Sequence, residues 1–288
     1  MSRPLVATAV ATALLWLALG TQESLPTLTR GAEDWSGDFR AYYLPNAEFA
    51  ASQLASGRLP LWNPYQGAGT PFLASIQPGV LYPPNWLHLF LPPSTAFLTL
   101  IALHLALAVL TTGALARRLG ASPIGASIAG LAYATSVQVV GSIWTPPLVY
   151  TAAWMPAVVF AVDRIIDRPS ASSSAALAIT TALPILVGWP YTVALTALAC
   201  ALYGGGRLLA RVAIERAIPW RVGGALAAGA IVGVLLAAPQ LVPSSELLGL
   251  SCRALGSIIE EQAIFVPGPH DPRLFIRSAL AHGFNDGV

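Results

Sequence analysis

The stretch STAFLTLIALHLALAVLTTGALA, residues 94–116, decides the structural class of this chain. It contains no Asp, Glu, Lys or Arg, and about 20 apolar residues are enough for a helix to cross the hydrocarbon core of a bilayer. A helix is favoured there because it satisfies its own backbone hydrogen bonds without water. The stretch therefore predicts a transmembrane helix.

The composition of the whole chain agrees with this stretch. Of the 288 residues 55% are hydrophobic and only 10% are charged, against about one quarter charged in an average soluble domain. The net charge of +2, without a basic run interleaved with aromatic residues, gives no indication of nucleic-acid binding. We predict an all-α integral membrane protein in which residues 1–288 form one domain in contact with membrane lipids. The apolar runs predict about seven transmembrane helices, at 5–20, 94–116, 121–141, 147–163, 172–189, 190–206 and 223–243.

The placement of charge predicts an orientation. If the spans alternate, one set of arginines falls on a single side, which should be the cytoplasm, together with the N-terminus: Arg3, Arg117, Arg118, Arg164, Arg168, Arg207, Arg211, Arg216 and Arg221. Two long extracytoplasmic segments remain, at 21–93 and 244–288, in a cell (inner or plasma) membrane. The first run also resembles a signal peptide ending at Gly20, and either interpretation places residue 21 outside.

The first long segment contains GRLPLWNPYQGAGTPF, residues 57–72, whose prolines forbid a continuous helix. Its glycines permit left-handed backbone, so we expect a structured loop packed by its own Trp and Tyr against the helix ends. Before this loop, residues 39–56 have the apolar spacing of a short amphipathic helix lying on the membrane.

Several segments together resemble the YfhO-type bacterial membrane proteins. The first extracytoplasmic loop of that family is matched by Asp38 with Tyr42-Tyr43-Leu44-Pro45, by Gly57 to Tyr65, by Gly69-Thr70-Pro71-Phe72, by Gln77, and by Tyr82-Pro83-Pro84-Asn85. Gly188-Trp189-Pro190-Tyr191 resembles its Gly-His-Pro-Gln element with two departures. Two later segments, 237–246 and Ser251-Cys252-Arg253, resemble its Gln-Leu-X-Pro-X-X-Glu and Ser-X-Arg segments.

The resemblance implies a GT-C-type membrane domain, in which an inverting glycosyltransferase moves a sugar from a polyprenyl-phosphate carrier to an acceptor on the extracytoplasmic face. Members of that family are longer, so this chain is expected to be a truncated member whose independent activity is in doubt. Two other functions stay open: a transporter or flippase of lipid-linked material, and a non-catalytic membrane scaffold. A transporter predicts paired charges at mid-membrane, for which the runs offer little.

The resemblance also implies a catalytic residue, because GT-C-type enzymes carry an aspartate or acidic pair at this point of the first loop. Asp38 matches it as the general base, and the alternative is that Asp38 caps the following helix. Glu33 and Asp34 lie close enough in sequence to share the site or a divalent cation. No other metal or cofactor is predicted.

The substrate-binding candidates are polar or aromatic residues of the two long segments and of the segments that resemble the family. Arg40, Arg58 and Arg253 have the forked donors that suit a lipid phosphate, although headgroup contact is the alternative. Gln240 and Glu246 are expected either to bind sugar hydroxyls or to satisfy backbone freed by prolines. His104, in mid-span, is expected to be a neutral imidazole bonded to a neighbour unless it is functional. The remaining candidates, which are expected either to bind sugar and lipid headgroup or only to brace the helices, are Trp62, Asn63, Tyr65, Gln77 and Tyr82.

Overall fold

The computed structural model describes Pro4 and residues 6–12, 37–136, 139, 142–216 and 219–250. Residues up to Ser244 form one compact unit, and a second unit begins at Ser245. Of the predicted first span, residues 6–12 are described and are helical. The described part is mostly helical, which confirms the predicted all-α class.

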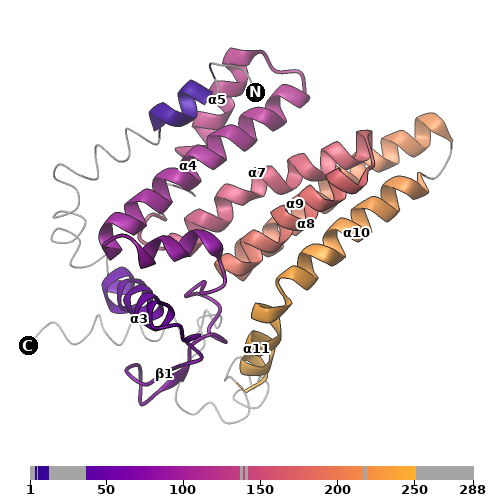
Figure 1. Ribbon diagram of the computed structural model, residues 1–288. Coiled ribbons are helices and arrows are strands. Elements are labelled where there is room, and N and C mark those ends of the chain that lie inside the picture. Colours follow the sequence, from indigo (N-terminus) through magenta and orange to yellow (C-terminus); the bar gives the residue numbers. More distant parts are fainter. Residues whose placement is uncertain are drawn as a thin grey trace, which may run out of the picture. The chain divides into compact units, whose positions relative to one another are not determined.

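The elements follow one another along the chain and are labelled in Figure 1 where there is room. They are a π-helical turn η2 (Phe39–Tyr43), α3 (Leu44–Ala55), β1 (Trp62–Asn63), β2 (Thr70–Pro71), a 3₁₀ helix η3 (Pro83–Leu89), α4 (Pro93–Arg118), α5 (Pro123–Ala134), α7 (Pro146–Asp167), α8 (Ala171–Val187), α9 (Pro190–Glu215), α10 (Trp220–Leu236) and α11 (Ala238–Gly249).

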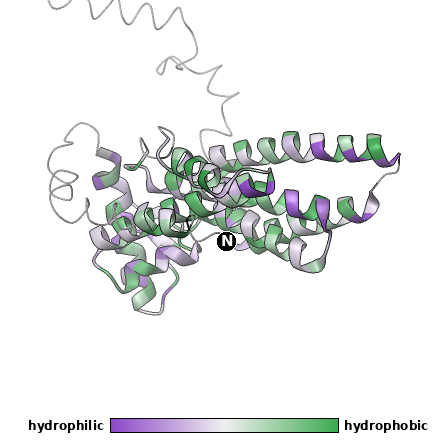
Figure 2. Cartoon of the chain, turned by 90° about the horizontal axis from the view of Figure 1, so that it is seen from above, coloured by the Kyte–Doolittle hydropathy of each residue, from purple (hydrophilic) through white to green (hydrophobic). Residues whose placement is uncertain are grey.

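Three of the described helices, α4, α7 and α9, are long and apolar enough to cross a membrane. A fourth span results if α10 and α11, which meet at an angle of 68°, count as one broken span. The bend follows from sequence, because Pro239 has no N–H to continue the ladder of α10. Figure 2 shows hydrophobic residues over most of the length of these helices.

Two other predicted spans form apolar helices of fewer than 18 residues, of which α8 lies within two residues of its predicted bounds. The run 121–141 forms α5, which stops at Ala134, where the Thr135 hydroxyl donates to the Leu131 carbonyl. The run 172–189 forms the 17-residue α8, only about 26 Å long, which ends at Gly188 with φ of 94°. Seven spans are therefore not confirmed by the described residues.

Small residues bring the helices close together. A Cβ on Gly130 of α5 would lie 2.5 Å from the Val109 carbonyl oxygen of α4. On α10, a Cβ on Gly229 would lie 2.9 Å from the Ser174 carbonyl oxygen of α8, and one on Gly233 would lie 2.8 Å from that of Ala178. Such close backbone approach is how helices gain packing energy in a membrane, where the hydrophobic effect between them is weak.

Helix α7 is the centre of the bundle. It packs against α4, α8 and α9, while α10 packs against α8. Leu100 and Leu105 of α4 meet Val149 and Ala153 of α7 in the larger core cluster. A second cluster near the C-terminal half of α7 contains Ile165 and neighbours from α8 and α10.

At the C-terminal end of α7 lies a cluster that we call the charged end. It consists of Arg118, Asp163, Asp167, Tyr203, Arg207 and Arg211. Asp163 is only 1% exposed and accepts hydrogen bonds from Arg118, Arg207 and the Tyr203 hydroxyl. The C-terminal ends of α4 and α7 thus meet the C-terminal half of α9 through these side chains.

Residues 37–92, which we call the lobe, lie at the opposite ends of α4 and α7. The predicted helix over 39–56 is confirmed as η2 followed by α3. The loop 57–72 is structured as predicted, with Trp62 paired to Pro71 and Asn63 to Thr70 in an antiparallel hairpin.

The expected packing of this loop by its own Trp and Tyr is found only in part, since the Tyr65 ring packs edge-on against Phe49 of α3, with centroids 6.1 Å apart. Trp62 is 53% and Tyr65 86% exposed, whereas Phe72, at 1%, and Leu73 are buried. Phe72 packs edge-on against Phe49 of α3, with ring centroids 4.9 Å apart. The apolar residue that follows the turn, and not the two amphipathic rings within it, anchors the hairpin.

Candidate functional site

Asp38 lies exposed at the start of η2. The next residue, Phe39, packs edge-on against Phe97 of α4 at 4.9 Å and Trp144 at 6.2 Å. This contact fixes the chain at the N-terminal ends of α4 and α7. Asp38 forms no capping hydrogen bond, so the structure gives no support to the alternative that it serves as a helix cap.

Asp38 also acts electrostatically on the lobe. Burial, the neighbouring Tyr42 and the Asp38 carboxylate together raise the pKa of Tyr43 to about 12. Tyr43 is buried and lines a cavity beneath α3. Asp38 itself is not among the residues that line this cavity.

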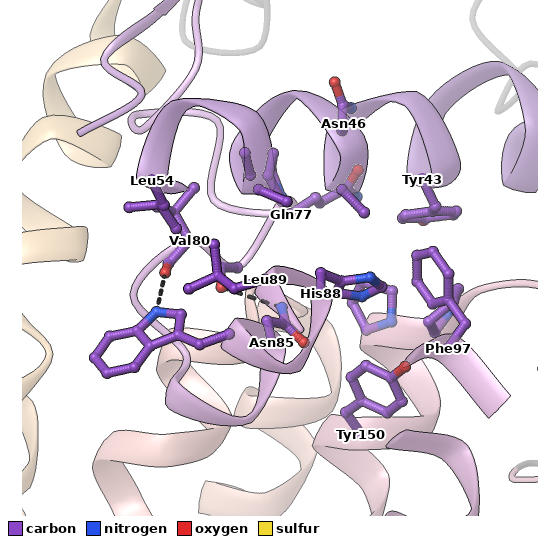
Figure 3. A pocket seen from close by; sticks show the side chains of 18 residues that line it. Tyr43, Asn46, Leu54, Gln77, Val80, Asn85, His88, Leu89, Phe97 and Tyr150 are labelled. Carbon is purple, nitrogen blue, oxygen red and sulfur yellow. Dashed lines mark hydrogen bonds between the residues drawn. The ribbon is translucent and has the colours of Figure 1, made fainter. Parts of the chain in front are cut away.

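We call this space the polar cavity. It lies between α3, η3 and the first turns of α4 and α7, and its volume is about 40 Å³ (Figure 3). A space of that size holds a few water molecules or one small chemical group, and not a whole sugar ring. Its lining includes Gln77, one of the predicted substrate-binding residues.

The segment under the cavity is held by two side-chain hydrogen bonds. Asn85 Nδ2 donates to the Gly79 carbonyl at 3.1 Å, and Trp86 Nε1 donates to the Val80 carbonyl at 3.0 Å. Figure 3 draws both bonds as dashed lines. Because a carbonyl only accepts, the first bond identifies the free amide atom of Asn85 as its oxygen.

Three buried polar atoms beneath α3 in the cavity lining have no hydrogen-bond partner: Asn85 Oδ1, His88 Nδ1 and the Tyr150 hydroxyl. A fourth, Asn46 Nδ2 of α3, has none either, but Figure 3 shows the Asn46 side chain on the opposite side of α3. Burial lowers the pKa of His88 to about 4, so its imidazole is neutral at physiological pH. The cavity therefore offers hydrogen bonds without a formal charge. Buried polar atoms in folded proteins nearly always have a partner, so these three atoms mark a place where a polar group fits.

Tyr82 stands behind this surface. It is 0% exposed, its hydroxyl lies 2.6 Å from His104 Nε2, and Trp154 Nε1 donates to it at 2.8 Å. His104 Nδ1 lies 2.6 Å from the Leu100 carbonyl and must donate to it, so Nε2 accepts from Tyr82. This chain of bonds confirms the bonded, neutral imidazole expected for His104 and gives Tyr82 a bracing contact, not a surface for substrate.

A second hollow, which we call the hairpin groove, has a volume of about 450 Å³ and lies between α3 and the hairpin. Three hairpin residues line it, Asn63, Tyr65 and Gln66, opposite Glu48 of α3. Asn63 is buried, and its Oδ1 accepts from the Tyr65 backbone N–H at 3.0 Å. The groove is large enough for a sugar ring and brings together two predicted binding residues, Asn63 and Tyr65.

Trp62 lies beside this groove and not in its lining. Its ring covers Gly69, which has φ of 106° and on which a Cβ would lie 2.6 Å from the indole. Only glycine fits there, which explains part of the Gly-rich sequence of the loop.

The remaining candidates are spread out. Arg40 and Arg58 are exposed and form no ion pair with any described residue. Gln240 is 1% exposed and its Nε2 donates to the Leu73 carbonyl at 2.6 Å, so it braces the lobe. Glu246 is exposed and belongs to the second unit. Glu33, Asp34 and Arg253 lie outside the described residues.

Sequence reasoning did not select the unpartnered atoms of the polar cavity. Asn85 stood within a segment that resembles the family, but His88 carried no ligand-like spacing and Tyr150 lay inside an apolar run. A tyrosine in the first turn of a span could have been noticed as a polar group at the membrane boundary. Within the described ranges, no group of three or more His, Cys, Asp or Glu side chains could hold a metal ion.

Comparison with known proteins identifies no relative. No protein-family model matches the chain, and no curated protein or solved structure matches it.

Proposed function

We propose that the protein is a membrane glycosyltransferase of GT-C type, which transfers a sugar from a polyprenyl-phosphate carrier to an acceptor on the extracytoplasmic face. The observation that carries the proposal is the position of Asp38. An exposed carboxylate lies at the start of η2, one residue before Phe39, which packs against Phe97 and Trp144 at the ends of α4 and α7, and it contributes to the raised pKa of Tyr43, which lines the polar cavity. The choice of reaction rests on the sequence resemblance to the YfhO-type proteins.

In the proposed reaction, Asp38 takes the proton of the acceptor hydroxyl as that oxygen attacks the anomeric carbon. The new carbon–oxygen bond forms while the bond from the anomeric carbon to the phosphate oxygen breaks. The lipid phosphate leaves with the bonding electron pair and needs no proton, because it is already a stable anion. This single displacement inverts the anomeric configuration, and a positioned base is worth about 10²–10⁴-fold in rate.

The remaining lobe residues receive binding roles. The hairpin groove is proposed to hold the sugar ring between the exposed Tyr65 face and the amides of Asn63 and Gln66. Arg40 and Arg58 carry exposed guanidinium groups with no ion pair in the described chain, and these are proposed to meet the carrier phosphate.

The proposal includes an orientation. We place the charged end in the cytoplasm, since arginines accumulate on that side of membrane proteins, and the lobe outside. It also includes seven spans, with the first apolar run, α5 and α8 crossing beside the longer helices. A lobe exposed outside the cell could then receive a carrier-linked sugar from the outer leaflet.

The transporter alternative is less favoured by the contacts. Transport through the bundle calls for polar residues down the spans, such as paired charges at mid-membrane. In the described helices, His104 is bonded to Tyr82 and Leu100, and Asp163 to Arg118 and Arg207. These groups hold the structure together and leave little for a moving solute.

The experiment that tests the proposal compares Asp38→Asn with the unchanged protein in membranes supplied with labelled polyprenyl-phosphate sugars. We expect transfer to fall by about 10²–10⁴-fold, because the amide cannot accept the acceptor proton. Thermal unfolding should be unchanged, because Asp38 is exposed and caps nothing.

The matched control is Glu215→Gln, which also removes one negative charge but at the opposite end of the bundle, where Glu215 pairs with Arg211. It should retain transfer. Equal rates in Asp38→Asn and the unchanged protein would remove Asp38 as the base.

A further inference from the structure

The polar cavity is lined by a few polar atoms without partners and by apolar side chains. Beneath α3, its polar atoms without partners are an amide oxygen, an imidazole nitrogen and a phenol hydroxyl, contributed by Asn85, His88 and Tyr150, while the unpartnered Nδ2 of Asn46 belongs to a side chain that Figure 3 shows above α3. Tyr150 is 2% exposed, and Figure 3 shows its hydroxyl directed towards the side of the cavity where His88 and Phe97 lie. Apolar residues, including Val80 and Leu89, complete the lining.

This lining excludes charged groups as occupants. No Asp, Glu, Lys or Arg lines the cavity, and the imidazole of His88, with its pKa of about 4, is neutral at physiological pH. A phosphate or an ammonium would lose its hydration without gaining a counter-charge, which is costly in a buried site. The occupant must therefore be neutral.

The lining also fixes the hydrogen-bonding pattern. Asn85 Oδ1 can only accept, because the Nδ2 of the same amide donates to Gly79. The Tyr150 hydroxyl can donate, and His88 Nδ1 can do either. An aliphatic hydroxyl meets all of these, since it donates once and accepts twice, and the apolar lining suits the carbon that carries it.

We propose that the polar cavity binds the hydroxymethyl group of a neutral hexose. The volume of about 40 Å³ admits such a group and no ring, and the half-exposed Trp86 at its edge shows that the lining reaches the surface. The choice of a sugar as ligand rests on the proposed function. Binding without transfer is the property measured, so that the two proposals can fail separately.

The test uses two probes that differ only in this group: methyl β-D-glucopyranoside and methyl β-D-xylopyranoside, which lacks the hydroxymethyl carbon. The full chain is placed in phospholipid nanodiscs, so that no glycoside detergent competes, and the affinity of each probe is measured by calorimetry or ligand-observed NMR. One buried methylene and one or two neutral hydrogen bonds predict that the glucoside binds about tenfold more tightly.

Two tyrosine variants separate binding from packing. Tyr150→Phe keeps the ring stacked on His104 and removes only the unpartnered hydroxyl. We expect the preference for the glucoside to fall to about threefold or less, with no loss of thermal stability. Tyr133→Phe removes a hydroxyl that donates to the Ala152 carbonyl at 2.8 Å, away from the cavity. It should lower the melting temperature and keep the tenfold preference.

Three outcomes would overturn the inference. The first is equal affinity for both glycosides in the unchanged protein, and the second is an unaltered preference in Tyr150→Phe. The third is that neither probe binds and the cavity holds nothing but ordered water. Asp38→Asn separates this inference from the proposed function. A variant that has lost transfer but keeps the preference supports both proposals. If the protein shows the preference but no transfer, the cavity assignment stands and the proposed glycosyltransferase activity is wrong.

Discussion

The two ends of the helical bundle differ in whether their polar groups are paired. At the charged end, two carboxylates and two guanidinium groups satisfy one another: Arg118 and Arg207 each bond to both Asp163 and Asp167. The Tyr203 hydroxyl adds a bond of 2.6 Å to the buried Asp163. These bonds pair the charged groups of the cluster with one another, although Asp167, Arg207 and Arg211 also line a hollow of about 470 Å³.

At the lobe end the polar groups are left open. Asp38, Arg40 and Arg58 form no ion pair with a described residue, and buried polar atoms of four residues that line the polar cavity have no partner. Unpaired buried polar groups reduce stability, so a protein retains them where they serve a purpose. The difference separates an end built to hold α4, α7 and α9 together from an end that is available to a ligand.

The largest effect should come from breaking the charged end. Asp163→Asn removes a carboxylate that is 1% exposed and leaves Arg118 and Arg207 facing a neutral amide. Removing one partner of a buried ion pair typically costs about 3–5 kcal/mol. We expect a loss of that size in the free energy of unfolding, measured by denaturant titration in lipid–detergent micelles.

Asp167→Asn is the matched control for this change. Asp167 accepts bonds from the same two arginines, but its side chain is 47% exposed, so water can replace them. Its loss should cost less than about 1 kcal/mol. Similar losses in both variants would mean that burial does not distinguish the two carboxylates and that the cluster contributes little as a unit.

A smaller effect is expected where the lobe joins the bundle. Gly188 ends α8 with φ of 94°, and a Cβ there would lie 2.1 Å from the Ile76 carbonyl oxygen. Gly188→Ala should cost about 3 kcal/mol, from left-handed backbone and from displacement of the lobe. Gly57→Ala has φ of 70° and no atom within 4 Å, so it should cost only about 1 kcal/mol. Thermal unfolding of the two variants gives the comparison, and equal losses would show that the contact with Ile76 is easily relieved.

The bundle was predictable to the extent that apolar length determines it. Residues 94–116 had to be helical because their backbone has no other partner in a membrane, and α4 follows. The length of α5 was not predictable, because α5 stops at Ala134 and Thr135 bonds back to its own helix. The helix α8 lies within two residues of its predicted bounds and ends at Gly188, whose φ is 94° and which lies against Ile76.

The site was predictable only in part, for a related reason. Asp38 and the hairpin residues stand out as polar groups in an apolar chain. Asn85, His88 and Tyr150 acquire meaning only when α3, η3 and α7 enclose one cavity. Gln240 shows the reverse, since a polar side chain near the predicted site bonds to the Leu73 carbonyl and braces the backbone. Sequence spacing does not reveal which polar groups find partners in the fold.

Acidification gives a further test of the difference between the two ends. As the pH falls, the effect of His88 on the stability of the lobe begins at a higher pH than the protonation of ordinary carboxylates. Burial lowers the pKa of His88 from 6.5 to about 4, so between these values the unfolded chain binds a proton that the folded protein does not. The stabilisation is therefore complete above pH 6.5 and is lost as the pH falls towards 4, by up to about 1.4 kcal/mol per unit.

His88→Leu isolates this contribution. Between pH 7 and 5 the unchanged protein should lose up to about 2 kcal/mol of unfolding free energy that the variant does not lose. The other titratable groups are common to both proteins and cancel in the difference. Denaturant titrations at pH 7, 6 and 5 measure it, and parallel curves for the two proteins would mean that protonated His88 is tolerated in the folded lobe. The cavity could then no longer be regarded as a site for neutral groups alone.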